Sequence, residues 1–225
     1  MAITDLDYYQ QAVLLLAALI ALTSFLMLGQ ARLLRLVLIF GVQGWLLAAT
    51  TALVANVLSF PHLYISAALS LVLKGILIPI MLQRLVMQMG LHRELDTVQN
   101  PALVMMGGTS LVVFSYYISL PVVKLSSMVT VNTVAVSLAV VLLGLLLMIT
   151  RRHAVAQVVG FMAMENGLFF AAVASTQGMP MVVELGIAFD VLVAAVIFGV
   201  FFFHIRSSID SLDVDRLNRL SEVDR

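Results

Sequence analysis

Long apolar segments constrain this chain more than any other feature, because each is long enough to cross the hydrocarbon core of a bilayer. A spanning helix needs about 20 mostly apolar residues, and in lipid only helices and closed barrels satisfy every backbone hydrogen bond. The chain has seven such segments, at residues 8–29, 33–57, 62–88, 101–123, 127–150, 154–176 and 180–205. The sequence therefore predicts an all-α, polytopic transmembrane bundle of about seven helices.

Composition agrees with a membrane protein and argues against several other classes. Of the 225 residues, 62% are hydrophobic and 11% are charged, whereas an ordinary soluble domain has about 25% charged residues. Basic and acidic residues balance at 12 each, so the charge does not indicate a nucleic-acid partner. The chain has no Cys, which excludes disulfides and iron–sulfur ligation by its own thiolates.

Prolines mark several segment boundaries and one interior position. Pro61 and Pro180 open the third and seventh segments, where a missing backbone N–H does no harm, and Pro101 opens the fourth. Pro79 lies inside the third segment, close to Lys74. An interior proline removes one backbone hydrogen bond of the helix, so the sequence predicts a kink near Lys74.

The arginines predict an orientation in the membrane. With seven helices, all of them fall on one side: Arg32, Arg35, Arg84, Arg93, Arg151, Arg152, Arg206, Arg216, Arg219 and Arg225. The positive-inside rule then places the N-terminus outside and the C-terminus in the cytoplasm. The polar residues 206–225 are predicted to be either a solvated tail or a docking segment for a cytoplasmic partner.

Four ionisable residues lie inside the apolar segments: Lys74, Glu165, Glu184 and Asp190. A charge at the bilayer centre costs roughly 2.5–3.5 kcal/mol on insertion scales, so such residues are rare and often serve ion or proton movement. Glu165 and Asp190 are predicted to relay protons, with Lys74 as a partner whose charge responds to a nearby carboxylate. The structural alternative is a lysine paired with either carboxylate, or a hydrogen-bonded carboxyl, that holds the helices together.

Glu184 and Lys124 complete the candidate set for ion relay. Glu184 precedes Asp190 by six residues, which separates the two by about 120° around a helix, so they do not share a face. The alternative for Glu184 is a position near the membrane interface, where a charge costs little free energy and needs no role in ion transfer. The alternative for Lys124 is a side chain that extends its ammonium group to the interface, known as snorkelling. Neither metal-ligand spacing nor a nucleophile–base pair or phosphate loop is present. The sequence thus predicts no catalytic centre, metal or cofactor in this chain.

An internal repeat is a further prediction. When GVQGWLLAA in the second segment and AMENGLFFAA in the sixth are aligned on their glycine, Gln43 falls on Asn166. A helix that begins with proline and carries a central charge, Lys74 or Asp190, follows each segment. Chance similarity between apolar helices is the alternative. The predicted division is a three-helix unit, a linking helix, a second three-helix unit and a tail, at residues 1–100, 101–126, 127–205 and 206–225.

The run GFMAMENG, followed by VELGIAFD and SLDVDRLNRL, resembles component E of hydrogenase-4-type membrane complexes, which are energy-converting nickel–iron hydrogenase and formate hydrogenlyase assemblies. The segments LKGILIP and PVVKL are similar to that family too, and the resemblance extends over about residues 35–220. The last three helices also resemble the K subunit of respiratory complex I and the C subunit of Mrp-type antiporters. In the K subunit, two consecutive helices each carry an embedded glutamate. Glu165 matches the first, and Asp190 or Glu184 matches the second.

This resemblance implies a non-catalytic membrane subunit of a complex I-like hydrogenase or formate hydrogenlyase in a prokaryotic inner membrane. Nickel–iron and iron–sulfur centres are then expected in partner subunits, beside antiporter-like membrane subunits. The chain would help couple electron transfer in those subunits to proton or sodium movement. The alternatives are a scaffold that moves no ions, a stand-alone secondary transporter, and a homologue in a complex with another electron donor. The sequence does not determine the ion, the donor, or the direction and stoichiometry of coupling.

Overall fold

The computed structural model describes residues 8–58, 61–88, 100–121, 128–175, 185–197 and 199–200. This part of the chain is helical and contains no β-strand. The helices are α1 (Tyr8–Leu28), α2 (Leu33–Leu58), α3 (Pro61–Ser70), α4 (Ile78–Gln88), α5 (Pro101–Ser119), α6 (Met128–Thr150) and α7 (Ala154–Ser175), followed by the helix Leu185–Ile197. A π-helical stretch, Leu71–Leu77, joins α3 to α4 without a break.

The all-α prediction is confirmed, and the boundaries of the first six predicted segments fall within a few residues of the observed ones, whereas both predicted ends of the seventh, at 180 and 205, lie outside the described residues. Six of the described helices are long and apolar enough to cross a membrane, if α3, the π-helical stretch and α4 are taken as one. The helix Leu185–Ile197 is apolar but shorter in its described part. The chain is therefore a multi-pass membrane protein.

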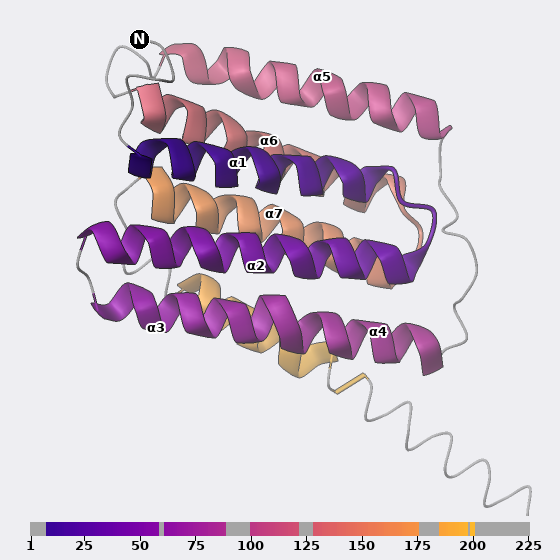
Figure 1. Cartoon of the computed structure of the whole chain (residues 1–225). Helices are drawn as coiled ribbons and strands as arrows, with labels where there is room; N and C mark the ends of the chain where they lie inside the picture. Colours follow the sequence, from indigo (N-terminus) through magenta and orange to yellow (C-terminus); the bar gives the residue numbers. More distant parts are fainter. Residues whose placement is uncertain are drawn as a thin grey trace, which may run out of the picture.

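The helices pack in two layers, with α5 along one side (Figure 1). The front layer consists of α1, α2 and the α3–α4 helix, and α6, α7 and the helix Leu185–Ile197 lie behind it. Helix α1 contacts α6, α2 contacts α7, and α5 packs mainly on α6. Helices α2 and α7 thus pack against each other at the centre of the bundle, and the side chains between them are shielded from the surroundings.

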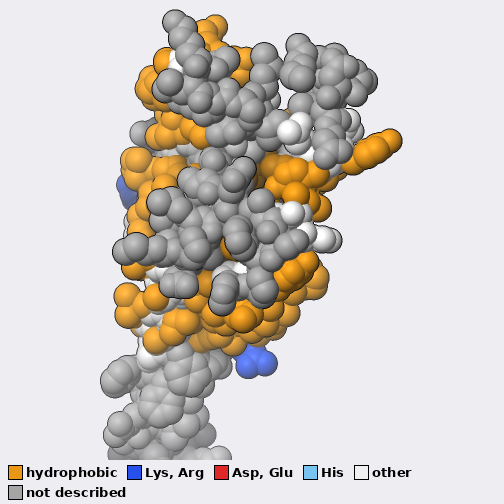
Figure 2. Space-filling model, turned by 90° about the vertical axis from the view of Figure 1, so that its left-hand side faces the viewer, with side chains coloured by type: hydrophobic (Ala, Val, Ile, Leu, Met, Phe, Trp, Pro, Cys, Tyr) orange, Lys and Arg blue, Asp and Glu red, His pale blue; other side chains and the backbone are white. Residues whose placement is uncertain are grey.

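The surface suits a lipid environment. Large hydrophobic side chains are exposed along the helices, and on α5 they include Leu103, Met106, Phe114, Tyr117 and Ile118. In the end-on view of Figure 2, hydrophobic side chains cover most of the described surface that is visible. A soluble protein rarely exposes so much contiguous apolar surface, whereas a bilayer solvates it.

Glycines allow the central helices to approach closely. A Cβ atom on Gly144 of α6 would lie 2.6 Å from the backbone N of Met164 and 2.7 Å from the carbonyl oxygen of Gly160, both on α7. These distances leave no room for a side chain. Small residues at helix crossings are typical of membrane bundles, where close backbone packing drives association.

The α1–α2 and α6–α7 connections lie at the same end of the bundle as the end of α4 (Figure 1). The arginines at or near these points therefore gather at one end, as the sequence pattern requires; among the described residues they are Arg32, Arg35, Arg84, Arg151 and Arg152. Arg151 is buried, and its Nη2 donates to the carbonyl oxygens of Leu28 (2.7 Å) and Gln30 (2.8 Å), which ties the two connections together. Which end faces the cytoplasm stays a prediction.

The helix changes its winding ahead of Pro79. Directly before it, Leu71–Leu77 is wound as a π-helix, and the backbone N–H of Ile78 donates to the carbonyl of Leu73, five residues earlier. In an α-helix the N–H of residue 79 would donate to the carbonyl of Gly75, and proline has no N–H to give. The structure therefore shows a change of helix type that includes Lys74, and the kink itself stays a prediction.

Candidate functional site

Lys74 lies at the centre of the bundle and contacts both predicted carboxylates. Its Nζ donates a hydrogen bond to Oε2 of Glu165 and lies 3.3 Å from Oδ1 of Asp190. The three side chains come from the π-helical stretch, from α7 and from the helix Leu185–Ile197. The structure thus brings together residues that are far apart in the sequence, and we call them the charged row.

The charged row is almost fully removed from solvent. The side chains of Lys74 and Asp190 are 0% exposed and that of Glu165 is 12% exposed. The Phe169 ring lies over the ammonium, with its centroid 5.0 Å from Nζ, so its negative face adds a cation–π attraction. Burial of charged groups is tolerated only where they are paired, because the desolvation penalty is several kcal/mol per ion.

Pairing in the charged row is incomplete. Oε1 of Glu165 and both carboxylate oxygens of Asp190 are buried and accept no hydrogen bond from the residues that the structure describes. When all three groups are ionised, one ammonium faces two carboxylates, which leaves one negative charge in excess. The row is neutral when one carboxyl group holds a proton. The geometry therefore suits a site where two carboxylates bind one proton or small cation in alternation.

A small cavity adjoins the charged row on the side of Glu165. Its volume is about 170 Å³, and it is lined by Glu165, Leu168, Phe169, Leu185, Gly186 and Phe189. A Cβ atom on Gly186 would lie 3.1 Å from Oε1 of Glu165, so a glycine at this position lets the helix Leu185–Ile197 approach the carboxylate closely. The cavity thus lies between α7 and the helix Leu185–Ile197, with Glu165 in its wall.

A second row of buried polar side chains lies beside the first, and we call it the neutral row. Asn166 of α7 donates from Nδ2 to Oε1 of Gln43 on α2 (3.1 Å), and Nε2 of Gln43 donates to Oγ of Ser24 on α1 (2.6 Å). The Ser24 hydroxyl donates in turn to the carbonyl oxygen of Ile20 (3.1 Å). The neutral row therefore links three helices through uncharged groups.

Gly44 explains how α2 reaches the site. A Cβ atom on Gly44 would lie 2.8 Å from the backbone C and O atoms of Lys74, and 3.0 Å from the N of Gly75. The α2 backbone therefore packs directly on the π-helical stretch. This contact places Gln43, the preceding residue, next to α7 and keeps Lys74 turned toward the two carboxylates.

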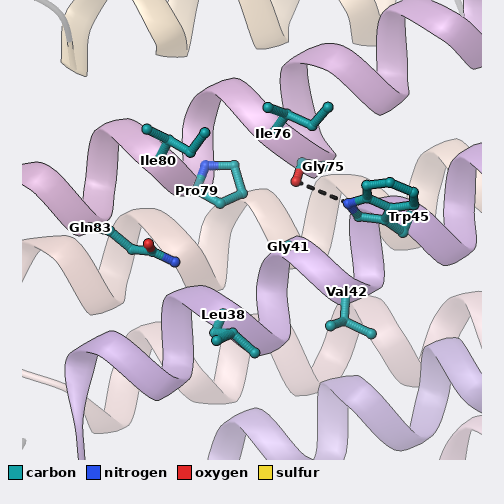
Figure 3. A pocket seen from close by; sticks show the side chains of 9 residues that line it. All are labelled: Leu38, Gly41, Val42, Trp45, Gly75, Ile76, Pro79, Ile80 and Gln83. Atoms are coloured by element: carbon teal, nitrogen blue, oxygen red, sulfur yellow. Dashed lines mark hydrogen bonds between the residues drawn. The ribbon is translucent and has the colours of Figure 1, made fainter.

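A groove lies on the outer side of the same helix pair (Figure 3). Its volume is about 320 Å³, and its lining residues are Leu38, Gly41, Val42, Trp45, Gly75, Ile76, Pro79, Ile80 and Gln83. The indole Nε1 of Trp45 donates to the carbonyl oxygen of Gly75 at 3.2 Å, the dashed line in Figure 3. The indole thus bonds the residue directly after Lys74.

The structure places three of the five predicted relay residues, Lys74, Glu165 and Asp190, in one cluster. The other two, Glu184 and Lys124, lie outside the described residues. Within the described ranges, the structure forms no group of three or more His, Asp or Glu side chains that could hold a metal ion.

Sequence reasoning did not identify the contacts of Trp45, Phe169 and Ser24 with this region. A tryptophan inside an apolar segment, whose indole N–H needs an acceptor, was the available signal for the first. Gln43 and Asn166 were aligned as repeat positions, and the structure bonds them to each other. Contact between equivalent positions is what a two-fold axis between two units would produce. The repeat itself stays a prediction.

Comparison with known proteins found one relative among curated sequences that bears on the family. The chain is 36% identical over 153 residues to the uncharacterized protein Rv0085 of Mycobacterium tuberculosis (strain ATCC 25618 / H37Rv), and the alignment covers 68% of this chain and 70% of that protein. The printed name of that protein states no activity or partner. No protein-family model matches the chain, and no solved structure matches it.

Proposed function

The chain belongs to the family of the mycobacterial protein Rv0085, and we propose that it is an ion-coupling membrane subunit of a complex I-like oxidoreductase. The assembly that fits the sequence resemblance is a hydrogenase or formate hydrogenlyase complex in a prokaryotic inner membrane. Electron transfer would occur at nickel–iron and iron–sulfur centres in other subunits. This chain, packed beside antiporter-like subunits, would link that electron transfer to proton or sodium movement.

One observation carries the proposal: a buried lysine is shared by two carboxylates that retain unsatisfied oxygens. A purely structural ion pair gains most when every polar atom is hydrogen-bonded. Here the excess negative charge is removed by one proton, which either Glu165 or Asp190 can hold. A charge that arrives next to the row changes the proton affinity of both carboxylates, so protons rearrange along it.

The test uses the assembled complex in sealed membrane vesicles. Redox turnover and ion movement are recorded together for the wild type and Glu165→Gln. The amide keeps the shape of the side chain but carries no exchangeable carboxyl proton. We expect ion movement per turnover to fall at least about tenfold, because positioned acid–base groups contribute factors of about 10²–10⁴ to proton-transfer rates. Glu165→Asp is the matched control, since it retains a carboxyl group, and recovery of partner subunits checks assembly.

Other outcomes distinguish the alternatives. Unchanged ion movement in Glu165→Gln and in the matching Asp190→Asn variant would make the chain a scaffold that moves no ions. Ion or solute uptake by the isolated protein in liposomes would support a stand-alone transporter. Replacing sodium in the vesicle buffer with a larger organic cation separates the two ions, because coupling to protons survives the exchange and coupling to sodium does not.

A further inference from the structure

Trp45 is half-exposed on the outer face of α2, yet its polar atom is turned inward, toward the helix that carries Lys74 (Figure 3). Its indole N–H donates to the carbonyl oxygen of Gly75. The contact is close: a Cβ atom at position 75 would lie 3.1 Å from Cδ1 and 3.2 Å from Nε1 of Trp45, so a larger residue there would displace the indole by a few tenths of an ångström. The indole is therefore hydrogen-bonded to the backbone of the π-helical stretch at Gly75, the residue after Lys74.

Pro79 removes one donor that an α-helix would offer to this carbonyl. Gly75 precedes Pro79 by four residues, which is the spacing of the α-helical hydrogen bond that proline cannot make. An unsatisfied carbonyl is costly in hydrocarbon. The Trp45 N–H supplies a hydrogen bond that Pro79 cannot supply, and it approaches from a different helix.

The winding of this stretch decides where Lys74 points. A π-helical turn contains more residues than an α-helical turn, and each residue of an α-helix turns the chain by about 100°. Return of Leu71–Leu77 to α-helical winding would rotate Lys74 relative to Pro79 and α4. The ammonium would then lose its position between Glu165 and Asp190, which it occupies in the π-helical form.

We propose that Trp45 is a positioning residue: its bond to Gly75, opposite Pro79, holds the π-helical winding that aims Lys74 at the two carboxylates. This geometric role is independent of what the site transports. A consequence for ion movement rests on the proposed function above. Trp45 lines the groove described above, and its positioning role needs no occupant in that groove.

The test is a double-mutant cycle on the full chain in nanodiscs. The coupling free energy between Lys74 and Glu165 is measured with Lys74→Met and Glu165→Gln, first in the wild type and then in Trp45→Phe. The phenyl ring retains apolar packing but has no N–H. We expect the coupling to fall to about half or less. Tyr64→Phe, which removes a polar group from another half-exposed aromatic side chain in the same layer, is the matched control. Unchanged coupling in Trp45→Phe overturns the proposal.

A second measurement covers the case in which Trp45→Phe does not fold. The chain has one tryptophan, so its indole N–H gives a single NMR signal. Pro79→Ala restores a backbone N–H that competes for the Gly75 carbonyl, and we expect the indole signal to shift. An unshifted signal contradicts the proposed competition.

Ion movement in the assembled complex then separates the two proposals. If coupling between Lys74 and Glu165 falls while ion movement is unchanged, Trp45 positions the lysine but the charged row is not on the transport path. If both fall, the two proposals stand together. If coupling is unchanged, the positioning role fails whatever happens to ion movement.

Discussion

The charged row and the neutral row start from adjacent residues of α7, Glu165 and Asn166, and run through the same protein interior. They nevertheless differ in how their hydrogen bonds are satisfied. In the neutral row, Asn166, Gln43 and Ser24 pass hydrogen bonds from helix to helix, and within the described residues only Oδ1 of Asn166 lacks a partner. In the charged row, three carboxylate oxygens lack one.

This difference in hydrogen bonding suggests different roles for the two rows: the neutral row suits helix packing, and the charged row suits proton exchange. A neutral amide or hydroxyl keeps its protons, so the neutral row holds helices together and its state does not depend on pH. A lysine between two carboxylates has several protonation states, because a proton can sit on either carboxyl group or on neither. The carboxylate oxygens of the charged row that accept no hydrogen bond from the described residues are the atoms that such a proton would occupy.

The largest expected effect comes from Lys74→Met, which removes the cation and leaves two buried carboxylates facing one another. Breaking a buried ion pair in this way costs about 3–5 kcal/mol. We expect a loss of that order in the free energy of unfolding, measured in nanodiscs or by denaturant titration in detergent. The double variant Lys74→Met, Glu165→Gln serves as the control and should recover part of the loss. If the single variant is as stable as the wild type, the row makes no net contribution as an ion pair.

Gly44→Ala tests whether close packing holds α2 against the lysine helix. The added methyl group would lie 2.8 Å from the backbone of Lys74, so the two helices must separate, at a cost of about 1–3 kcal/mol for overpacking. Both rows should weaken together, because Gly44 follows Gln43 in the chain and packs on the backbone of Lys74. Gly107→Ala is the matched control: its nearest neighbour, a methyl of Leu146, is 3.9 Å away. Equal stability of the two variants would contradict the packing argument.

The sequence predicted the helices well because length and hydropathy are local properties. Apolar runs of about 20 residues separated by Arg and Pro leave little freedom in a bilayer. It also identified Lys74, Glu165 and Asp190 one by one, since any charge in such a run is exceptional. The proposed complex, its partners and its ion are not tested by this fold and stay predictions.

What the sequence could not show depends on tertiary contacts. Lys74 had two possible partners, and only helix packing reveals that it contacts both. Pro79 predicted a kink, whereas the structure shows a π-helical stretch whose carbonyl at Gly75 accepts a hydrogen bond from Trp45 on another helix. Ser24 gave no sequence signal, because a serine in a membrane helix usually bonds its own backbone.

Asn166→Leu is expected to lower the free energy of unfolding moderately and to leave ion movement per redox turnover unchanged. It leaves Oε1 of Gln43 without its donor, yet it also removes the unpaired Oδ1 of Asn166 itself. Hydrogen bonds between membrane helices contribute about 0.6 kcal/mol on average and up to about 1.7, so a loss in this range is expected from unfolding titrations. Ion movement per redox turnover should equal that of the wild type. A loss of ion movement with assembly intact would place the neutral row on the transport path.

Ser24→Ala should have the smallest effect. The Ser24 hydroxyl accepts from Gln43 and donates to the carbonyl of Ile20, but Nε2 of Gln43 also reaches that carbonyl at 3.5 Å. When the hydroxyl is removed, the amide can shift toward this second acceptor, so we expect a loss below about 0.6 kcal/mol. The control is Thr109→Ala, whose hydroxyl is exposed and bonds only its own helix at the carbonyl of Met105. A Ser24→Ala variant that loses more stability than Asn166→Leu would show that the neutral row depends on its α1 end.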